Sequence, residues 1–263
     1  MSKNPFESPC SARTVAHVVK NLERRWGLSI VSFLPRSAHE RCAEVQEEIA
    51  KSCGGEGEAG VRVGRQYIEF QDAEQLHCTH LTLRRSDPGG PVAVGDFIKE
   101  GRSLAEVLEA IHDVTRQLDP IDVELQSLRV RSDGPAIIAL GQCVGNAAVR
   151  ARSVLIDELH NRLGKLCSLS TQSWDKDSSM YHIVHCALGF LKRPLPGTFE
   201  EFKERVEGKK LSIPCRFREI TMVHHRHRTL LFPQEGCITF PLGKELDATV
   251  REFEEALNLA GVE

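Results

Sequence analysis

The chain has 263 residues, with 34 lysines and arginines against 37 aspartates and glutamates, which gives a formal net charge of −3. Because 41% of the residues are hydrophobic and 27% are charged, the composition is that of a folded globular protein and excludes a disordered or fibrous chain. The negative charge argues against a large surface for long duplex nucleic acid. No apolar stretch approaches the roughly 20 residues that a helix needs to span a bilayer, so we expect no membrane segment.

Nine cysteines and eleven histidines are the other notable counts. The cysteines are odd in number, include no CxxC pair and follow an N-terminus without the pattern of a secretory signal peptide. We therefore expect free thiols and a cytoplasmic location. The histidines are clustered, and two of their clusters carry the functional interpretation.

Hydrophobic spacing predicts the first elements in chain order. Helical spacing predicts an N-terminal helical extension over residues 1–26, and the sequence GLSIVSF predicts a strand that starts at Gly27. The S-x-x-E or T-x-x-E pattern of a capping box predicts helices that start near Ser37, Ser103 and Thr198. These starts make three amphipathic helices the best-supported part of the prediction.

The remaining elements follow from changes of period. Alternating apolar residues predict two β-hairpins, one over residues 121–140 and one over residues 217–242. Helical spacing predicts a helix over residues 147–166 and a closing C-terminal helix over residues 246–263. Two polar segments are expected to be mobile loops: 54–60 and 168–177.

Two short sequences built around paired histidines carry the functional argument. LHCTHLTL starts at Leu76 and YHIVHCAL starts at Tyr181, and both contain H-x-x-H-x-[T/A]-L, with an offset of 105 residues from His80 to His185. Each sequence is preceded by a predicted helix and followed by a capping-box helix and a hairpin. Because whole supersecondary units recur, we predict one domain made of two similar halves.

The paired motifs suggest acid–base chemistry. In a strand, His80 and Thr82 point to the same face, as do His185 and Ala187. If the halves pack around an approximate twofold axis, His80 and His185 face a common cleft. Opposed imidazoles can act as general base and general acid, which contributes on the order of 10² to 10⁴-fold in rate. With the Thr82 hydroxyl holding a phosphoryl oxygen, the pattern favours metal-independent attack at a phosphodiester.

These motifs resemble the signature of the two-histidine (2H) phosphoesterase superfamily, the LigT-like or 2′,5′-RNA-ligase-like proteins. Its signature is a pair of H-h-[S/T]-h motifs, where h is apolar. HLTL from His80 matches fully, whereas HCAL from His185 has Ala187 where the family has Ser or Thr. The similarity extends over residues 27–242, because GLSIVSFLP resembles the first strand of the family and REITMV resembles a strand that follows the second motif.

The resemblance implies an α+β, bilobal LigT-like fold, in which two pseudo-symmetric halves, each with an antiparallel sheet and helices, flank a central cleft. The two-lobed domain would span residues 27–245, between the N-terminal extension and the C-terminal helix. The resemblance also implies a metal-independent phosphodiesterase without a cofactor, acting on a 2′,3′-cyclic phosphate, a 2′,5′-linked oligonucleotide or a small cyclic nucleotide. His80 and His185 would be catalytic and Thr82 would bind phosphate, in a protein for which a monomer is plausible.

Ala187 opens an alternative function. A hydrogen bond to a charged group is worth roughly 1.5 to 3 kcal/mol, so the missing hydroxyl predicts weaker catalysis, an altered substrate or a replacement donor. The alternative is a nucleotide- or RNA-end-binding protein on the same fold with weak or lost catalysis. Candidate substrate contacts that would supply a replacement donor are Tyr181, His182, His224 and Arg226.

Two other interpretations of the histidines stay open. His77 and Thr79 form a competing H-x-T pair on the opposite face of the same strand, and we favour His80 because only its register gives H-x-T-L. A zinc site is less favoured, because ligands at i and i+3 on a strand point apart. The basic cluster over residues 224–228 is either a solvated turn or a phosphate contact, for which Arg226 has a suitable planar fork of donors.

Overall fold

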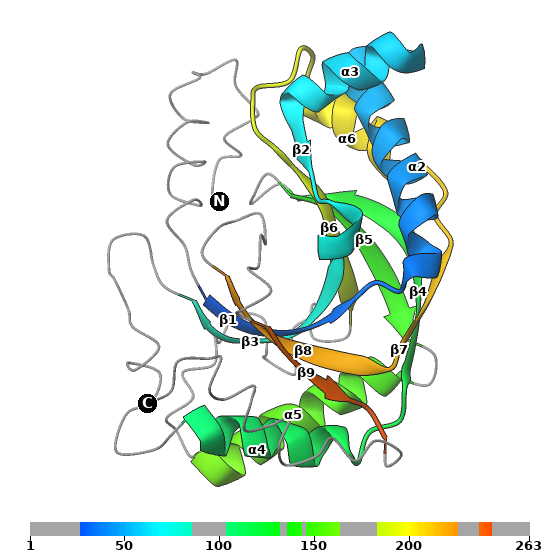
Figure 1. Ribbon diagram of the computed structural model, residues 1–263. Helices are drawn as coiled ribbons and strands as arrows, with labels where there is room; N and C mark the ends of the chain where they lie inside the picture. Colours follow the sequence, from blue (N-terminus) through cyan, green and yellow to red (C-terminus); the bar gives the residue numbers. More distant parts are fainter. Residues whose placement is uncertain are drawn as a thin grey trace.

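The computed structural model describes residues 27–85, 104–131, 136–143, 146–163, 183–225 and 237–243. Figure 1 shows these residues as a curled sheet with helices packed against it. The strands are β1 (Gly27–Phe33), β2 (Ile68–Phe70), β3 (His77–Arg85), β4 (Ile121–Val130), β5 (Ala136–Cys143), β6 (Val184–Leu191), β7 (Ile213–Phe217), β8 (Glu219–His225) and β9 (Cys237–Pro241). The helices are α2 (Arg36–Gly54), α3 (Gly57–Tyr67), α4 (Leu104–Thr115), α5 (Ala147–Leu163) and α6 (Phe199–Glu207), with a 3₁₀ turn η1 at Ala73–Gln75.

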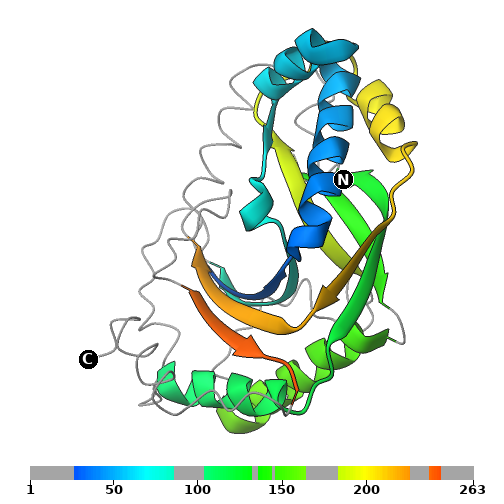
Figure 2. The ribbon, with the colours of Figure 1, turned by 45° about the vertical axis from the view of Figure 1, so that its right-hand side comes forward.

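All nine strands belong to one sheet, with the order β7-β4-β5-β6-β3-β1-β8-β9 and β2 paired to β6. The two strands that carry the histidine motifs, β3 and β6, are therefore neighbours at the centre. Strands β7 and β8 are separated in sequence only by Arg218, although five strands lie between them in the sheet. The sheet must curl to allow this, and Figure 2 shows the curl, with α4 and α5 below it and α2, α3 and α6 above.

One face of the sheet carries the hydrophobic core. Along β6, Val184, Cys186 and Leu188 have no exposed surface, while the intervening His185 and Ala187 are half-buried. This alternation is the period of two expected for a strand with one buried face. We call the buried side the core face; helices α2, α4, α5 and α6 contribute side chains to the same core.

Several predicted elements are confirmed. Strand β1 covers the segment predicted from Gly27, and α5 covers most of the helix predicted over 147–166. The predicted hairpins are the antiparallel pairs β4–β5 and β8–β9. Their apolar alternation is a local signal, which is why the sequence alone indicates them.

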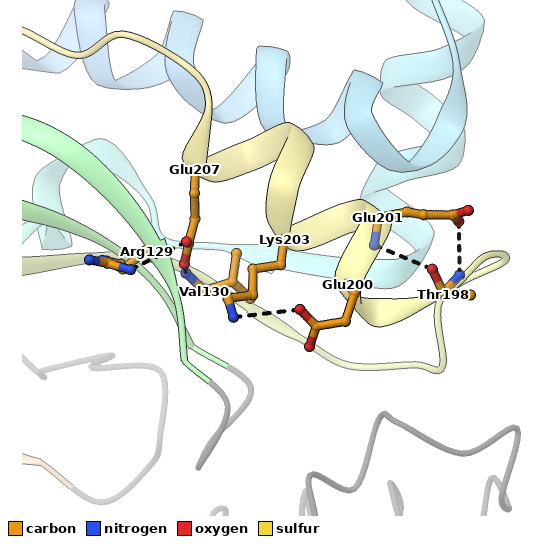
Figure 3. Close-up of polar contacts among 7 residues, drawn as sticks. All are labelled: Arg129, Val130, Thr198, Glu200, Glu201, Lys203 and Glu207. Atoms are coloured by element: carbon orange, nitrogen blue, oxygen red, sulfur yellow. Dashed lines mark hydrogen bonds and ion pairs between the residues drawn. The ribbon is translucent and has the colours of Figure 1, made fainter.

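The capping boxes have different outcomes. At α6 the box is present: the Glu201 amide donates to the Thr198 hydroxyl, and the Thr198 amide donates to the Glu201 carboxylate, both over 3.3 Å (Figure 3). At α2 the helix begins near the predicted residue, but the predicted box is absent: the helix begins at Arg36 behind Pro35, so Ser37 lies inside the first turn and makes no cap. Ser103 lies outside the described residues.

The predicted loop over 54–60 is also wrong, because α3 begins at Gly57 and packs on α2. Two of the glycines that suggested a loop, Gly54 and Gly60, lie where backbones are in close contact, whereas Gly55 and Gly57 have φ values of +90° and +74° at the short connection between the helices. A side chain on Gly60 would overlap the Gly55 carbonyl, and one on Gly64 would overlap the Ala50 carbonyl. Glycine is the residue that permits such close approach.

The predicted terminal segments 1–26 and 246–263, and the predicted loop over 168–177, lie outside the described residues. Within the part of the chain that the structure describes, no helix is both long enough and apolar enough to cross a membrane.

Candidate active site

His80 lies in the core. It is 1% exposed, its Nε2 lies 2.8 Å from the Ser32 hydroxyl, and its ring meets the Phe217 ring edge-on at 6.2 Å between centroids. Ser32 donates its single hydroxyl proton to the Glu219 carbonyl over 2.8 Å, so it must accept from His80 Nε2–H. The His80 ring is therefore neutral, with its lone pair on Nδ1, which is buried and has no hydrogen-bond partner.

The electrostatic environment agrees with a neutral His80. Burial is the largest of three causes that lower the pKa of His80 to about 3, and the charges of Arg152 and His77 add smaller contributions to this shift. Removing a charged imidazolium from water is costly, and a neighbouring cation adds repulsion. At neutral pH this ring is therefore not the imidazolium that a general acid would need, and its one N–H proton is donated to the Ser32 hydroxyl inside the core.

A β-bulge separates His80 from Thr82. In the pairing of β3 with β1, Thr79 faces Val31 and Leu81 faces Ile30, so His80 is an additional residue between two consecutive positions of β1. An extra residue shifts the alternation of the strand by one position. Leu81 consequently joins the core, and the backbone of Thr82 pairs with Ser29. The Thr82 side chain lies outside the side chains that the structure describes.

The register between the two central strands decides which histidines share a face. Cys78 of β3 faces Cys186 of β6, and both side chains are fully buried on the core face. Continuing this antiparallel register by one residue places Thr79 opposite His185 and His77 opposite Ala187, all on the face away from the core. The structure therefore does not bring His80 and His185 to one face; it brings His185 together with His77.

We call His77, Thr79, His185 and Ala187 the HxT cluster. Thr79, His185 and Ala187 are half-buried, whereas His77 is 4% exposed, with its ring edge-on to Phe33 at 6.0 Å. His185 also faces Leu140 of β5 across the other side of β6. The cluster thus places two imidazoles and one hydroxyl on adjacent strands.

The hydrogen bond of His77 fixes its protonation. Nδ1 lies 2.7 Å from the Gln75 carbonyl oxygen, which can only accept, so Nδ1 carries the proton. Burial lowers the pKa of His77 to about 4, and the bond to Gln75 opposes that shift in part. At neutral pH His77 is therefore a neutral ring with its lone pair on Nε2, the atom at which it can take up a proton.

The other predicted contacts lie largely outside the described part of the chain. Tyr181, His182 and Arg226 are among the residues that the structure does not describe, so it does not test their predicted contacts with substrate. The backbone of His224 pairs with Leu28 in β8, but its side chain is not described. Among the described residues, no group of three or more His, Cys, Asp or Glu side chains is arranged to hold a metal ion.

Sequence reasoning ranked His77 and Thr79 below His80 and Thr82, although one signal favoured them. His77 and His185 are each followed by cysteine, so HCT and HCA align in all but their third residue. The preference for His80 rests instead on the H-x-T-L register, which the apolar residue after Thr82 completes. The structure shows why the shared cysteine is informative: the two cysteines are the cross-strand pair that sets the register.

Comparisons with known proteins bear on the fold. No protein-family model matches the chain, and no curated protein matches it. The solved structure of TT0787 from Thermus thermophilus is similar, with a TM-score of 0.54 and 17% identity, and the match covers 84% of this chain and 100% of that one.

Two further solved structures also match, at lower TM-scores. The structure of a phosphoesterase matches with a TM-score of 0.42 and 12% identity, over 82% of this chain and 94% of that one. The structure of Escherichia coli LigT complexed with NADP⁺ matches with a TM-score of 0.40 and 12% identity, over 83% and 95% of the two chains. The fold assignment therefore uses TT0787, and this chain shares its fold, an α+β arrangement of a curled antiparallel sheet with helices packed against it.

Proposed function

We propose that the chain is a phosphodiesterase that uses the HxT cluster for general acid–base catalysis. The observation that carries the proposal is the pairing of Cys78 with Cys186, which places HCT and HCA side by side on the central strands. Both motif histidines then lie on the face that the hydrophobic core does not occupy. The α+β fold adds support, because it is the architecture that the resemblance to the LigT-like family leads us to expect around the paired motif.

The two histidines have different roles in this proposal. His77 is neutral with its lone pair on Nε2, so it acts as the base that takes the proton of the attacking hydroxyl or water. The attacking oxygen forms a bond to phosphorus, the bond from phosphorus to the leaving oxygen breaks, and His185 gives that oxygen its proton. The proton that His77 gained and the one that His185 lost then exchange with solvent, which restores the starting state.

Thr79 replaces Thr82 as the proposed phosphate ligand, because Thr79 lies beside His185 in the register. Ala187 occupies the equivalent position beside His77 and has no hydroxyl. The substrate class remains a 2′,3′-cyclic phosphate, a 2′,5′-linked oligonucleotide or a small cyclic nucleotide, and in each of them a single phosphodiester reacts at a time, which one hydroxyl can orient.

Ala187 also favours a second candidate function. With one of the two motif hydroxyls absent, the same face would bind a nucleotide or an RNA end with little or no turnover. A hydrogen bond to a charged phosphate contributes roughly 1.5 to 3 kcal/mol, which corresponds to a loss of about one to two orders of magnitude in rate.

The test is hydrolysis of this substrate panel by purified protein, with EDTA present throughout. We expect turnover that falls at least 100-fold in His77→Asn and in His185→Asn, because positioned proton transfer contributes on the order of 10² to 10⁴-fold. Asparagine at position 77 keeps a donor for the Gln75 carbonyl. The matched control is His80→Gln, which keeps a donor near Ser32 and should retain turnover within a few fold.

Two results would contradict this assignment. If folded His80→Gln loses turnover while His77→Asn keeps it, the face that carries the HxT cluster is not the reactive face. If nucleotides bind but none is turned over, and Ala187→Thr does not create turnover, the binding-protein function replaces the phosphodiesterase.

A further inference from the structure

The pairing between the two motif strands is unusually short. Among the described residues, β3 and β6 are paired at a single register position, Cys78 with Cys186. Their outer neighbours are paired over longer stretches, with seven positions in β1–β3 and six in β5–β6. The strands that carry the HxT cluster therefore have little ladder of their own to fix their separation.

A buried arginine spans these strands just beyond the point where the pairing ends. Arg152 projects from α5 and is 2% exposed. Its Nε donates to the His80 carbonyl of β3 over 2.8 Å, and its Nη2 donates to the Ile183 carbonyl, directly before β6, over 3.4 Å. One guanidinium thus bonds the backbones of both motif strands.

The chemistry of this contact suits arginine. A guanidinium is planar and rigid and presents several donors in fixed directions, whereas a lysine ammonium is a flexible point charge. Burying a cation is costly unless it is hydrogen-bonded, and the two carbonyls are part of that compensation. The two carbonyls that Arg152 bonds also lie close in sequence to the motif histidines, because Ile183 is two residues from His185 and His80 is three residues from His77.

We propose that Arg152 is a positioning residue that clamps β3 to β6 and so sets the relative placement of His77 and His185. This inference rests on the proposed function for its catalytic consequence. A misplacement of about 1 Å can cost on the order of 100-fold in rate, so a clamp on these strands would control turnover without touching the substrate.

The test compares Arg152→Lys and Arg152→Ala with Arg150→Lys and Arg150→Ala, whose parent side chain is exposed on the same helix. Hydrogen exchange without substrate should accelerate at least tenfold in β3 and β6 of the Arg152 variants, and stay unchanged in the β8–β9 hairpin. The turnover number, kcat, should fall 10- to 100-fold while KM stays within twofold. Added guanidinium ion should restore part of the kcat of Arg152→Ala and none of that of His185→Asn.

The two proposals fail separately. If the wild-type protein turns over no substrate, the phosphodiesterase proposal fails, while hydrogen exchange still tests the clamp. If exchange in β3 and β6 is unchanged, or if it accelerates in every element alike without guanidinium rescue, Arg152 is an ordinary core residue and the clamp is wrong.

Discussion

At the scale of single residues, hydrogen-bond direction sets the chemistry of the histidines. The Gln75 carbonyl forces the proton of His77 onto Nδ1, and the Ser32 hydroxyl, committed to Glu219, forces that of His80 onto Nε2. His77 therefore has its lone pair on the far nitrogen of the ring. The lone pair of His80 is enclosed in the core instead, where a buried acceptor without a partner costs free energy.

The same burial predicts how stability depends on pH. The pKa of His80 is about 3 in the folded state and 6.5 for a free histidine, so between these values the unfolded chain binds the proton and the folded chain does not. The free energy of unfolding then falls as pH decreases below 6.5. For one proton the loss is about 2 kcal/mol between pH 6.5 and pH 5, and His80→Gln should remove it. Urea unfolding at several pH values measures this.

Cys215→Ala is the matched control for that experiment. This substitution removes another buried core side chain. Burial raises the pKa of the Cys215 thiol to about 12, so the thiol does not change its charge between pH 6.5 and pH 5. Its curve of unfolding free energy against pH should run parallel to that of the wild type. A His80→Gln curve that is also parallel to the wild type would show that folding does not lower the pKa of His80.

At the scale of elements, the α2–α3 hairpin depends on backbone contact between helices. Gly60 and Gly64 are buried on α3, where any side chain would overlap carbonyls of the preceding α2–α3 segment. Helix propensity favours alanine over glycine by about 1 kcal/mol. The overlap is with backbone, which cannot move aside as a flexible side chain can, so packing outweighs propensity here.

We therefore expect Gly64→Ala to lower the free energy of unfolding by about 1 to 3 kcal/mol, the cost of overpacking a core. The neighbouring Val63→Ala is the control, because Val63 is 37% exposed and its truncation should change stability by less than about 0.5 kcal/mol. Thermal unfolding followed by circular dichroism measures both. If Gly64→Ala instead raises the free energy of unfolding, α2 and α3 move apart at little cost to admit the added methyl group.

At the scale of the whole molecule, one core joins both parts of the sheet. The buried cluster includes Val45 of α2 and Leu155 of α5, together with side chains from strands on both sides of the β3–β6 centre. Strands β7 and β8 follow one another directly and belong to opposite parts of the sheet. Neither half has a core of its own within the described residues.

This continuity predicts a single cooperative unfolding transition. Val45→Ala and Leu155→Ala should both lower the midpoint of that one transition, with a cost of about 2 to 5 kcal/mol for the leucine and less for the valine. Differential scanning calorimetry checks it by comparing the calorimetric and van't Hoff enthalpies. Two separable transitions, each sensitive to only one variant, would show that the halves fold independently.

The sequence by itself determined the local features of this protein. Apolar periodicity indicated both hairpins and α5, and the T-x-x-E pattern indicated the cap of α6, because these depend on residues close together in the chain. The paired histidine motifs, with the family resemblance they carry, indicated the α+β fold. Glycine misled at α3, where a residue typical of loops is needed for contact between helices.

Only the tertiary structure decided which histidine lies on which face. The face of the sheet to which a β3 side chain points depends on two features. One is the cross-strand register, which the Cys78–Cys186 pair fixes, and the other is the bulge at His80 in the pairing with β1. Neither is encoded in the alternation of β3 alone, because a shift of one residue exchanges the two faces. Arg152 had no signal in the sequence either, since its partners are backbone carbonyls on two other elements.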